Sequence, residues 1–382
     1  MNMRRLLPAV AVTLALLPSA RLGKAQMYYP PPQAYAMQPG VAMPQAYAMQ
    51  PGPAIPQGCA QGVVPQADPA GSCPASCNNC GCGSDWQIFG GALYLRPRNA
   101  AVEYAVPING PIVPGVTPLQ MGPTAMVDPD YKVGFYVGAA KDLDECSGIS
   151  VSYAYYANIS VDSVTTTAPL VLQSMVMNPS SMDAANYWNS ASARQFIGFQ
   201  LVDADYRCQF YRDTCGSVDY LLGFRYAHLG QQFDSNYESN FSAAVSSTVN
   251  FDCVGLRAGV EGERHNCNGL FVYGKTSVSV LAGDVQANYL QTSSTVSLPV
   301  ATTTWNEGRC VPMLDGELGV GWERPGGHFR GSIGYMMTGW LNVIKPADFI
   351  ASVQANSYHE ANALGQSDMV FDGFVSRLEF NW

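Results

Sequence analysis

Charged side chains recur at alternate positions inside several otherwise apolar stretches of the chain. In an extended strand, alternate residues share one face, so these charges would line a single polar surface. Acidic and basic residues on neighbouring strands could then pair, for example Asp203 or Asp205 with Arg225. The residues of this polar face are Asp203, Asp205, Arg207, Asp219, Arg225, Arg257, Glu261, Lys275, Asp315, Glu317, Arg330, Arg377 and Glu379.

Such a lining has two interpretations. If the strands enclose water, it sets the ion preference of a lumen. Alternatively, the charges form a structural network that fills the interior. Strand number bears on the choice, because about eight strands leave an interior just filled by side chains while 16 leave a channel. We favour a narrow pore, because glycines such as Gly138, Gly255 and Gly319 on the polar face would leave room.

The sequence predicts no enzyme, cofactor or metal site. His228, His265, His328 and His359 are scattered and show no ligand spacing. Neither a P-loop, a nucleophile elbow nor a Rossmann glycine pattern occurs where a strand–helix unit would need it. A Ser/His hydrolase assembled across a barrel is conceivable but has no motif to support it.

The elements that position the charges are ten segments of period-2 alternation, each of about 12 to 15 residues. Strands of soluble domains are commonly about five or six residues long, whereas a tilted strand crossing a bilayer needs about nine or more. The length therefore favours a membrane barrel. The segments are about 85–96, 131–142, 148–160, 196–210, 217–230, 248–262, 269–282, 311–323, 328–340 and 369–382.

The predicted connections alternate between short and long. Outer-membrane barrels have short periplasmic turns and longer outer loops. We therefore predict an all-β, transmembrane, antiparallel up-and-down β-barrel of about ten strands, within a range of 10 to 14. An even strand count would leave both ends of the barrel in the periplasm. The short connections are 143–147, 211–216, 263–268 and 324–327, and the long ones are 97–130, 161–195, 231–247, 283–310 and 341–368.

The last segment ends in an aromatic residue, as the strands recognised by bacterial barrel-insertion machinery do. Its apolar face carries Phe374, Leu378, Phe380 and Trp382, which we predict to be the insertion signal. An aromatic residue there would lie at the membrane interface.

Two segments precede the barrel region at 85–382. Residues 1–25 predict a signal peptide, with Arg4 and Arg5 before an apolar run that is too short to span a bilayer. Residues 26–84 contain a repeated Pro-Gln-Ala-Tyr-Ala-Met-Gln-Pro-Gly sequence and predict a disordered linker. The linker ends in a cluster formed by Cys59, Cys73, Cys77, Cys80 and Cys82.

The compartment argues for disulfides in this cluster, and its odd count leaves one thiol for a crosslink to another chain. A zinc site is the alternative, although the spacing matches no standard site. In the barrel we predict a Cys208–Cys215 disulfide across a short turn. We suggest Cys253 with Cys310 near the outer rim and Cys146 with Cys267 in periplasmic turns.

The overall charge argues against nucleic-acid binding. The formal net charge is −9, and loss of the four basic residues of the leader leaves 16 basic against 29 acidic residues, or −13. A nucleic-acid-binding protein would need the opposite sign.

Several motifs resemble the Legionella-type major outer membrane protein family. Phe89-Gly-Gly-Ala-Leu-Tyr-Leu-Arg-Pro97 is similar to the opening strand of that family, and Gly223-Phe-Arg-Tyr-Ala227 to its central Gly-x-Arg-Tyr strand. Leu314-Asp-Gly-Glu-Leu-Gly-Val-Gly321 and the terminal strand also look similar, so the resemblance spans about 85–382. The Pro/Gln and Cys-rich leader departs from the family and looks like extensions on such barrels in planctomycete-type bacteria.

The resemblance implies a pore-forming outer-membrane protein associated with cysteine crosslinking. We therefore expect passive diffusion of ions or small polar solutes. The alternatives are a structural barrel that anchors the membrane to the cell wall or to its own copies, and a surface β-sandwich binding module. The expected partners are outer-membrane lipid and the insertion machinery, with both termini in the periplasm.

Overall fold

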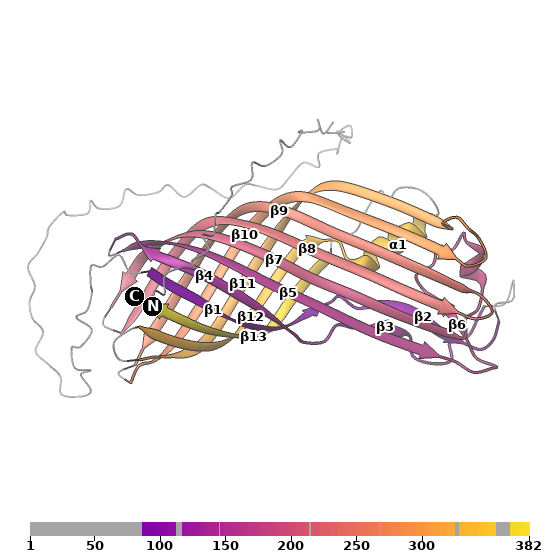
Figure 1. Ribbon diagram of the computed structural model, residues 1–382, viewed down its shortest axis with the longest axis horizontal. Helices are drawn as coiled ribbons and strands as arrows, with labels where there is room; N and C mark the ends of the chain where they lie inside the picture. Colours follow the sequence, from indigo (N-terminus) through magenta and orange to yellow (C-terminus); the bar gives the residue numbers. More distant parts are fainter. Residues whose placement is uncertain are drawn as a thin grey trace, which may run out of the picture. The chain divides into compact units, whose positions relative to one another are not determined.

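The computed structural model describes residues 86–111, 117–144, 146–213, 215–266, 268–324, 328–356 and 367–382. The predicted signal peptide, linker and cysteine cluster lie outside these residues. Within them, ten antiparallel strands form a closed barrel, as predicted, and this excludes the sandwich (Figure 1). The strands are β1 (Trp86–Arg98), β4 (Lys132–Asp142), β5 (Ser147–Thr165), β7 (Ser190–Arg212), β8 (Gly216–Glu238), β9 (Ser242–His265), β10 (Leu270–Ser293), β11 (Ala301–Glu323), β12 (Phe329–Val343) and β13 (Ser367–Asn381).

The outer face of the wall carries an apolar belt. On β8, every second residue from Val218 to Tyr226 points outward, and this set includes Leu222 and Phe224, which are 55% and 63% exposed. Eight residue steps at about 3.3 Å, tilted by about 40°, span roughly 20 Å, which is close to the height of the apolar band of an outer-membrane barrel. The belt is therefore the membrane-spanning part of the wall.

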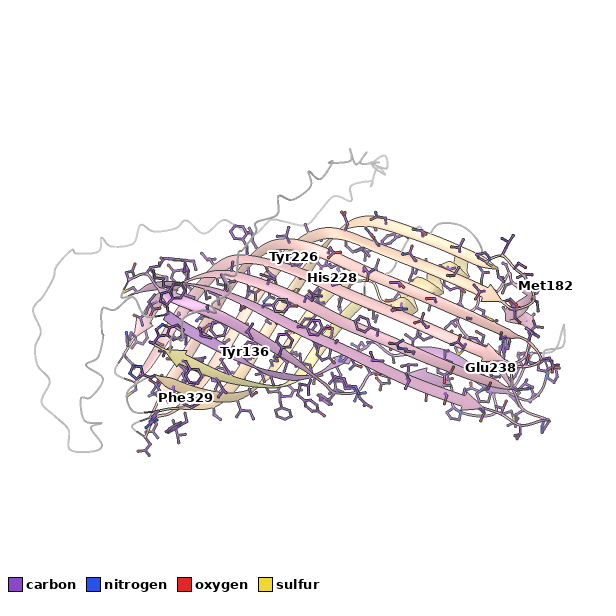
Figure 2. All side chains as sticks on the ribbon, in the orientation of Figure 1. Tyr136, Met182, Tyr226, His228, Glu238 and Phe329 are labelled. Carbon is purple, nitrogen blue, oxygen red and sulfur yellow. The ribbon has the colours of Figure 1, made fainter. Side chains whose placement is uncertain are left out.

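The belt ends where the apolar residues of each strand change from the outer face to the inner face of the wall. On β8, His228 follows Tyr226 on the outer face and is hydrogen-bonded to Asp252 of β9 (Figure 2). On β10, Val278 and Val280 point outward, whereas Val285 and Tyr289 are buried inside. Beyond the belt, apolar side chains therefore face the barrel interior and polar ones face water.

This change of face explains why the predicted strands were too short. β10 extends to Ser293 and β11 begins at Ala301, so the predicted long loop 283–310 is mostly strand. Likewise, the predicted loop 231–247 reduces to residues 239–241 between β8 and β9. Polar and apolar residues still alternate through both segments, but there the apolar residues point inward and the polar residues point outward.

The long-loop end of the barrel is filled by four inserted elements, which we call the plug. They are β2 (Val102–Ile108), β6 (Val171–Ser174), the 3₁₀ helix η1 (Met182–Ala185) and α1 (Pro346–Asn356), and β2 pairs with β6 and with β3 (Ala125–Val127) (Figure 1). On α1, Phe349, Ile350 and Val353 are buried in the main core cluster. That helix is too short to cross a bilayer, and no helix in the described residues is long and apolar enough to do so.

Inward-pointing side chains of the wall fix the plug through hydrogen bonds to its backbone. The hydroxyl of Tyr237 donates to the carbonyl of Tyr104 at 2.7 Å, and that of Tyr289 donates to the carbonyl of Val176 at 3.0 Å. Gln231 donates to the carbonyl of Ile344 at 2.8 Å. Burial raises the pKa of Tyr104 well above that of a free phenol, so its hydroxyl stays protonated and donates to a carboxylate.

The barrel closes between its first and last strands. β1 pairs with β13, and the backbones of Trp86 and Trp382 exchange two hydrogen bonds of 3.1 Å. The four residues of the predicted insertion signal point outward and are 50–58% exposed. Asp372, which shares this face, is held by Arg98 of β1 at 2.6 Å.

The described cysteines are free thiols, so the predicted Cys208–Cys215 and Cys253–Cys310 disulfides are not formed. Cys208 pairs in register with Tyr220, five residues from Cys215, because β7 continues to Arg212 and β8 begins at Gly216. Cys253 and Cys310 lie in mid-strand rather than at the rim, and on opposite faces of the wall, since Cys253 is buried inside and Cys310 is exposed.

Cys146 is exposed in a short turn, where its amide donates to Asp144. Its suggested partner Cys267 is outside the described residues.

The height of the belt can be tested with two outward positions on β11. Leu318 lies in the belt and Thr304 lies beyond it. We expect Leu318→Arg to lower the free energy of unfolding by about 2–4 kcal/mol, because the guanidinium would face hydrocarbon. Thr304→Arg should change it by less than about 0.5 kcal/mol. Denaturant titration in lipid vesicles measures both changes in the free energy of unfolding. Equal changes for the two variants would show that the belt does not end between Leu318 and Thr304.

Candidate functional site

A charged cavity of about 300 Å³ occupies the barrel interior on the short-turn side of the plug. All thirteen residues predicted to share a polar face lie on its wall. The sequence analysis missed Glu263, which also lines the cavity. The sequence pattern could have identified it, since Glu263 continues the alternation of Arg257 and Glu261 just beyond the predicted end of the segment.

Arg225 crosses the deepest part of this cavity. Its guanidinium on β8 forms a bidentate pair with Asp203 on β7, with nitrogen–oxygen distances of 2.6 and 2.8 Å. A third nitrogen donates to Asp315 on β11 at 2.6 Å. The side chain of Arg225 is only 3% exposed, so this bridge connects distant parts of the wall in a nearly dry environment. The expected cross-strand partner is thus Asp203 rather than Asp205.

Arg257 of β9 extends the same layer. It donates to Asp205 at 2.5 Å and to Asp203 at 2.9 Å. Ser277 of β10 accepts a 3.3 Å hydrogen bond from Arg257 and donates to Asp315 at 3.0 Å. We call Asp203, Asp205, Asp315, Arg225 and Arg257 the deep layer.

A looser set of pairs lies towards the short-turn end. Arg377 is 3.7 Å from Glu317 and from Glu379, and it donates to the hydroxyl of Tyr136 (Figure 2). Arg330 contacts Glu263 at 2.5 Å.

Two further contacts complete this looser set. Lys275 is 3.6 Å from Glu261, which is itself 3.9 Å from Arg207.

Exposure increases from the deep layer towards the short turns. The side chain of Asp205 is 6% exposed, whereas those of Glu263 and Arg207 are 28% and 31% exposed. The cavity is therefore hydrated from the short-turn end and closed at its inner end.

The interior glycines do not widen the lumen as the sequence analysis expected. Gly138 lies under the ring of Phe89, and Gly319 under the ring of Tyr273. A side chain at either position would collide with the aromatic ring. These glycines make room for protein side chains that lie flat on the wall, rather than for solute.

In the part of the chain that the structure describes, no three His, Cys, Asp or Glu side chains are arranged as the ligands of a metal centre. The four histidines are not brought together. His228 is on the outer face, and His265 is beside Glu263 at 3.0 Å.

The opening strand, the closing strand and the charged strands between them all fall within one family match. The model of the Legionella pneumophila major outer membrane protein precursor family matches residues 80–382. The chain belongs to this family. It is thus an outer membrane protein, and the resemblance of its separate motifs is confirmed by a match across the whole barrel.

Two solved structures are similar to this outer membrane protein at low sequence identity. The outer membrane protease OmpT from Escherichia coli is 10% identical with a TM-score of 0.45, and the match covers 78% of this chain and 97% of that one. A Pseudomonas aeruginosa FadL homologue is 7% identical with a TM-score of 0.22, over 78% and 90% of the two chains. No curated protein matches the sequence.

Removal of Arg225 tests the deep layer of this outer membrane protein. We expect Arg225→Met to lower the free energy of unfolding by about 3–5 kcal/mol, because Asp203 and Asp315 would remain buried without their shared cation. Arg194→Met, at an exposed position on β7, is the matched control and should cost less than about 0.5 kcal/mol. Both values come from denaturant unfolding. An Arg225→Met variant that is as stable as the wild type would contradict the role of Arg225 as the shared cation of the deep layer.

Proposed function

We propose that this outer membrane protein is a narrow, gated pore for passive diffusion of ions or small polar solutes. The observation that carries the proposal is the charged lining, in which fourteen Asp, Glu, Lys and Arg residues face one cavity while the outer belt is apolar. Charged side chains are costly to hold within a membrane, so a set of this size favours an aqueous path.

The plug makes the path gated. Its core residues Phe349, Leu172 and Tyr104 are completely buried, so the described residues of the plug leave no open passage between them. A solute that enters the cavity must therefore wait for the plug to shift. We infer that the short-turn end faces the periplasm, because short turns lie on that side in outer-membrane barrels.

Planar-bilayer recording with and without α1 tests this function. We expect the whole chain to open rarely and a variant with residues 346–356 replaced by a Gly/Ser linker to conduct for most of the recording. The control is a similar replacement of residues 294–299, an exposed connection between β10 and β11, which should behave like the whole chain. A sealed bilayer with every variant would exclude the pore.

A second candidate is a structural barrel with a permanently filled interior. The Arg225–Asp315 pair and the buried plug favour it, since both join strands that are not neighbours in the wall. In this role the barrel would anchor the membrane to the cell wall or to its own copies through the cysteines of the leader. Oligomers on a non-reducing gel that collapse with reductant, without conductance, would support it.

We expect no catalytic activity and no cofactor in either role. The supporting observation is that the buried polar side chains of the deep layer pair with one another. Outer-membrane lipid and the barrel-insertion machinery remain the expected partners.

A further inference from the structure

The deep layer carries one more negative charge than positive. It has three carboxylates, Asp203, Asp205 and Asp315, against two guanidinium groups, Arg225 and Arg257. Their side chains are between 3% and 18% exposed. Water therefore offers little compensation for the extra charge.

Two carboxylate oxygens in this layer have no hydrogen-bond partner among the described residues. They are Oδ1 of Asp205 and Oδ1 of Asp315, and both residues line the cavity. Asp205 is more than nine-tenths buried, and its Oδ1 packs against Gly223 of β8, in the place that a Cβ would fill. This carboxylate oxygen is thus enclosed without a hydrogen-bond partner.

The surroundings hold no spare positive charge. The nine other charged residues of the cavity are five acidic and four basic, and Asp219 directly faces Glu261 across β8 and β9. Like charges opposite one another in a sheet are destabilising. On the other side, the four plug elements contain no Lys, Arg or His. The missing charge must therefore come from outside the chain.

We propose that the deep layer binds one monovalent cation, either an inorganic ion or the ammonium group of a solute, in the cavity beside the carboxylates of Asp205 and Asp315. An uncompensated buried charge is strongly unfavourable, and one unit of positive charge restores neutrality. The inference rests on the proposed function in one respect: the cation must reach the layer through the hydrated cavity. Cations are then the class that the pore prefers.

Thermal unfolding of the purified full chain in detergent tests the site without requiring conductance. Sodium, potassium and methylammonium chlorides are compared with N-methyl-D-glucamine chloride, whose cation is too large, at equal ionic strength. We expect each small cation to raise the unfolding midpoint by about 2–5 °C, because binding to the native state stabilises it.

Substitution of Asp205 distinguishes this site from an ordinary ion pair. Asp205→Asn should abolish the response to small cations and should raise the midpoint in N-methyl-D-glucamine chloride above that of the wild type. The reason is that Arg257 keeps Asp203 as a partner while the excess charge disappears. Asp203→Asn should instead lower the midpoint in every salt, because Arg225 loses its bidentate partner.

Glu307→Gln, an exposed position outside the cavity, is the matched control and should keep the response. A wild-type midpoint that is equal in all four salts overturns the site, as does an Asp205→Asn variant that still responds. A midpoint that rises on acidification but not with small cations shows that a proton fills the site, which also overturns it. A sealed bilayer combined with a cation response would exclude the pore and keep the site.

Discussion

Closure of the hydrogen-bonded wall is the constraint on which the rest of the structure depends. Within hydrocarbon, every backbone N–H and C=O must find a partner in the protein, so a sheet can cross a bilayer only if it has no free edge. β1 and β13, nearly 300 residues apart in sequence, meet to remove that edge. Once the wall is closed, each strand has an inner and an outer face. Alternate residues along a strand then point to opposite faces.

The same wall then passes through two solvents. Near the short turns the outside is lipid and the inside is water, so the charged residues point inward. Beyond His228 the outside is water, and the interior is packed with side chains such as Phe233 and Tyr289. Since the strands are continuous, this exchange of faces happens within single strands. The long-loop half of the barrel therefore has an apolar interior and a polar outer face, like a soluble β-protein.

The strands and the charged lining could be predicted from the sequence because both follow from the alternation of polar and apolar residues along each strand. The ten segments and all thirteen charged residues were recognised from period-2 alternation. Features that depend on distant contacts were not recognised, for example the α1 side chain Gln354, which donates to the carbonyls of Met175 and Met177. The Cys208–Cys215 and Cys253–Cys310 pairs were wrong because the strands extend further than predicted, which places Cys253 and Cys310 in mid-strand on opposite faces of the wall.

The origin of the plug imposes an order on biogenesis. Its pieces come from three separate connections, and the wall residues that hold them lie on β8 and β10, which are synthesised after β2 and β6. The last piece, α1, is translated just ahead of the final strand. Completion of the plug and closure of the wall therefore both depend on the last two described elements, α1 and β13.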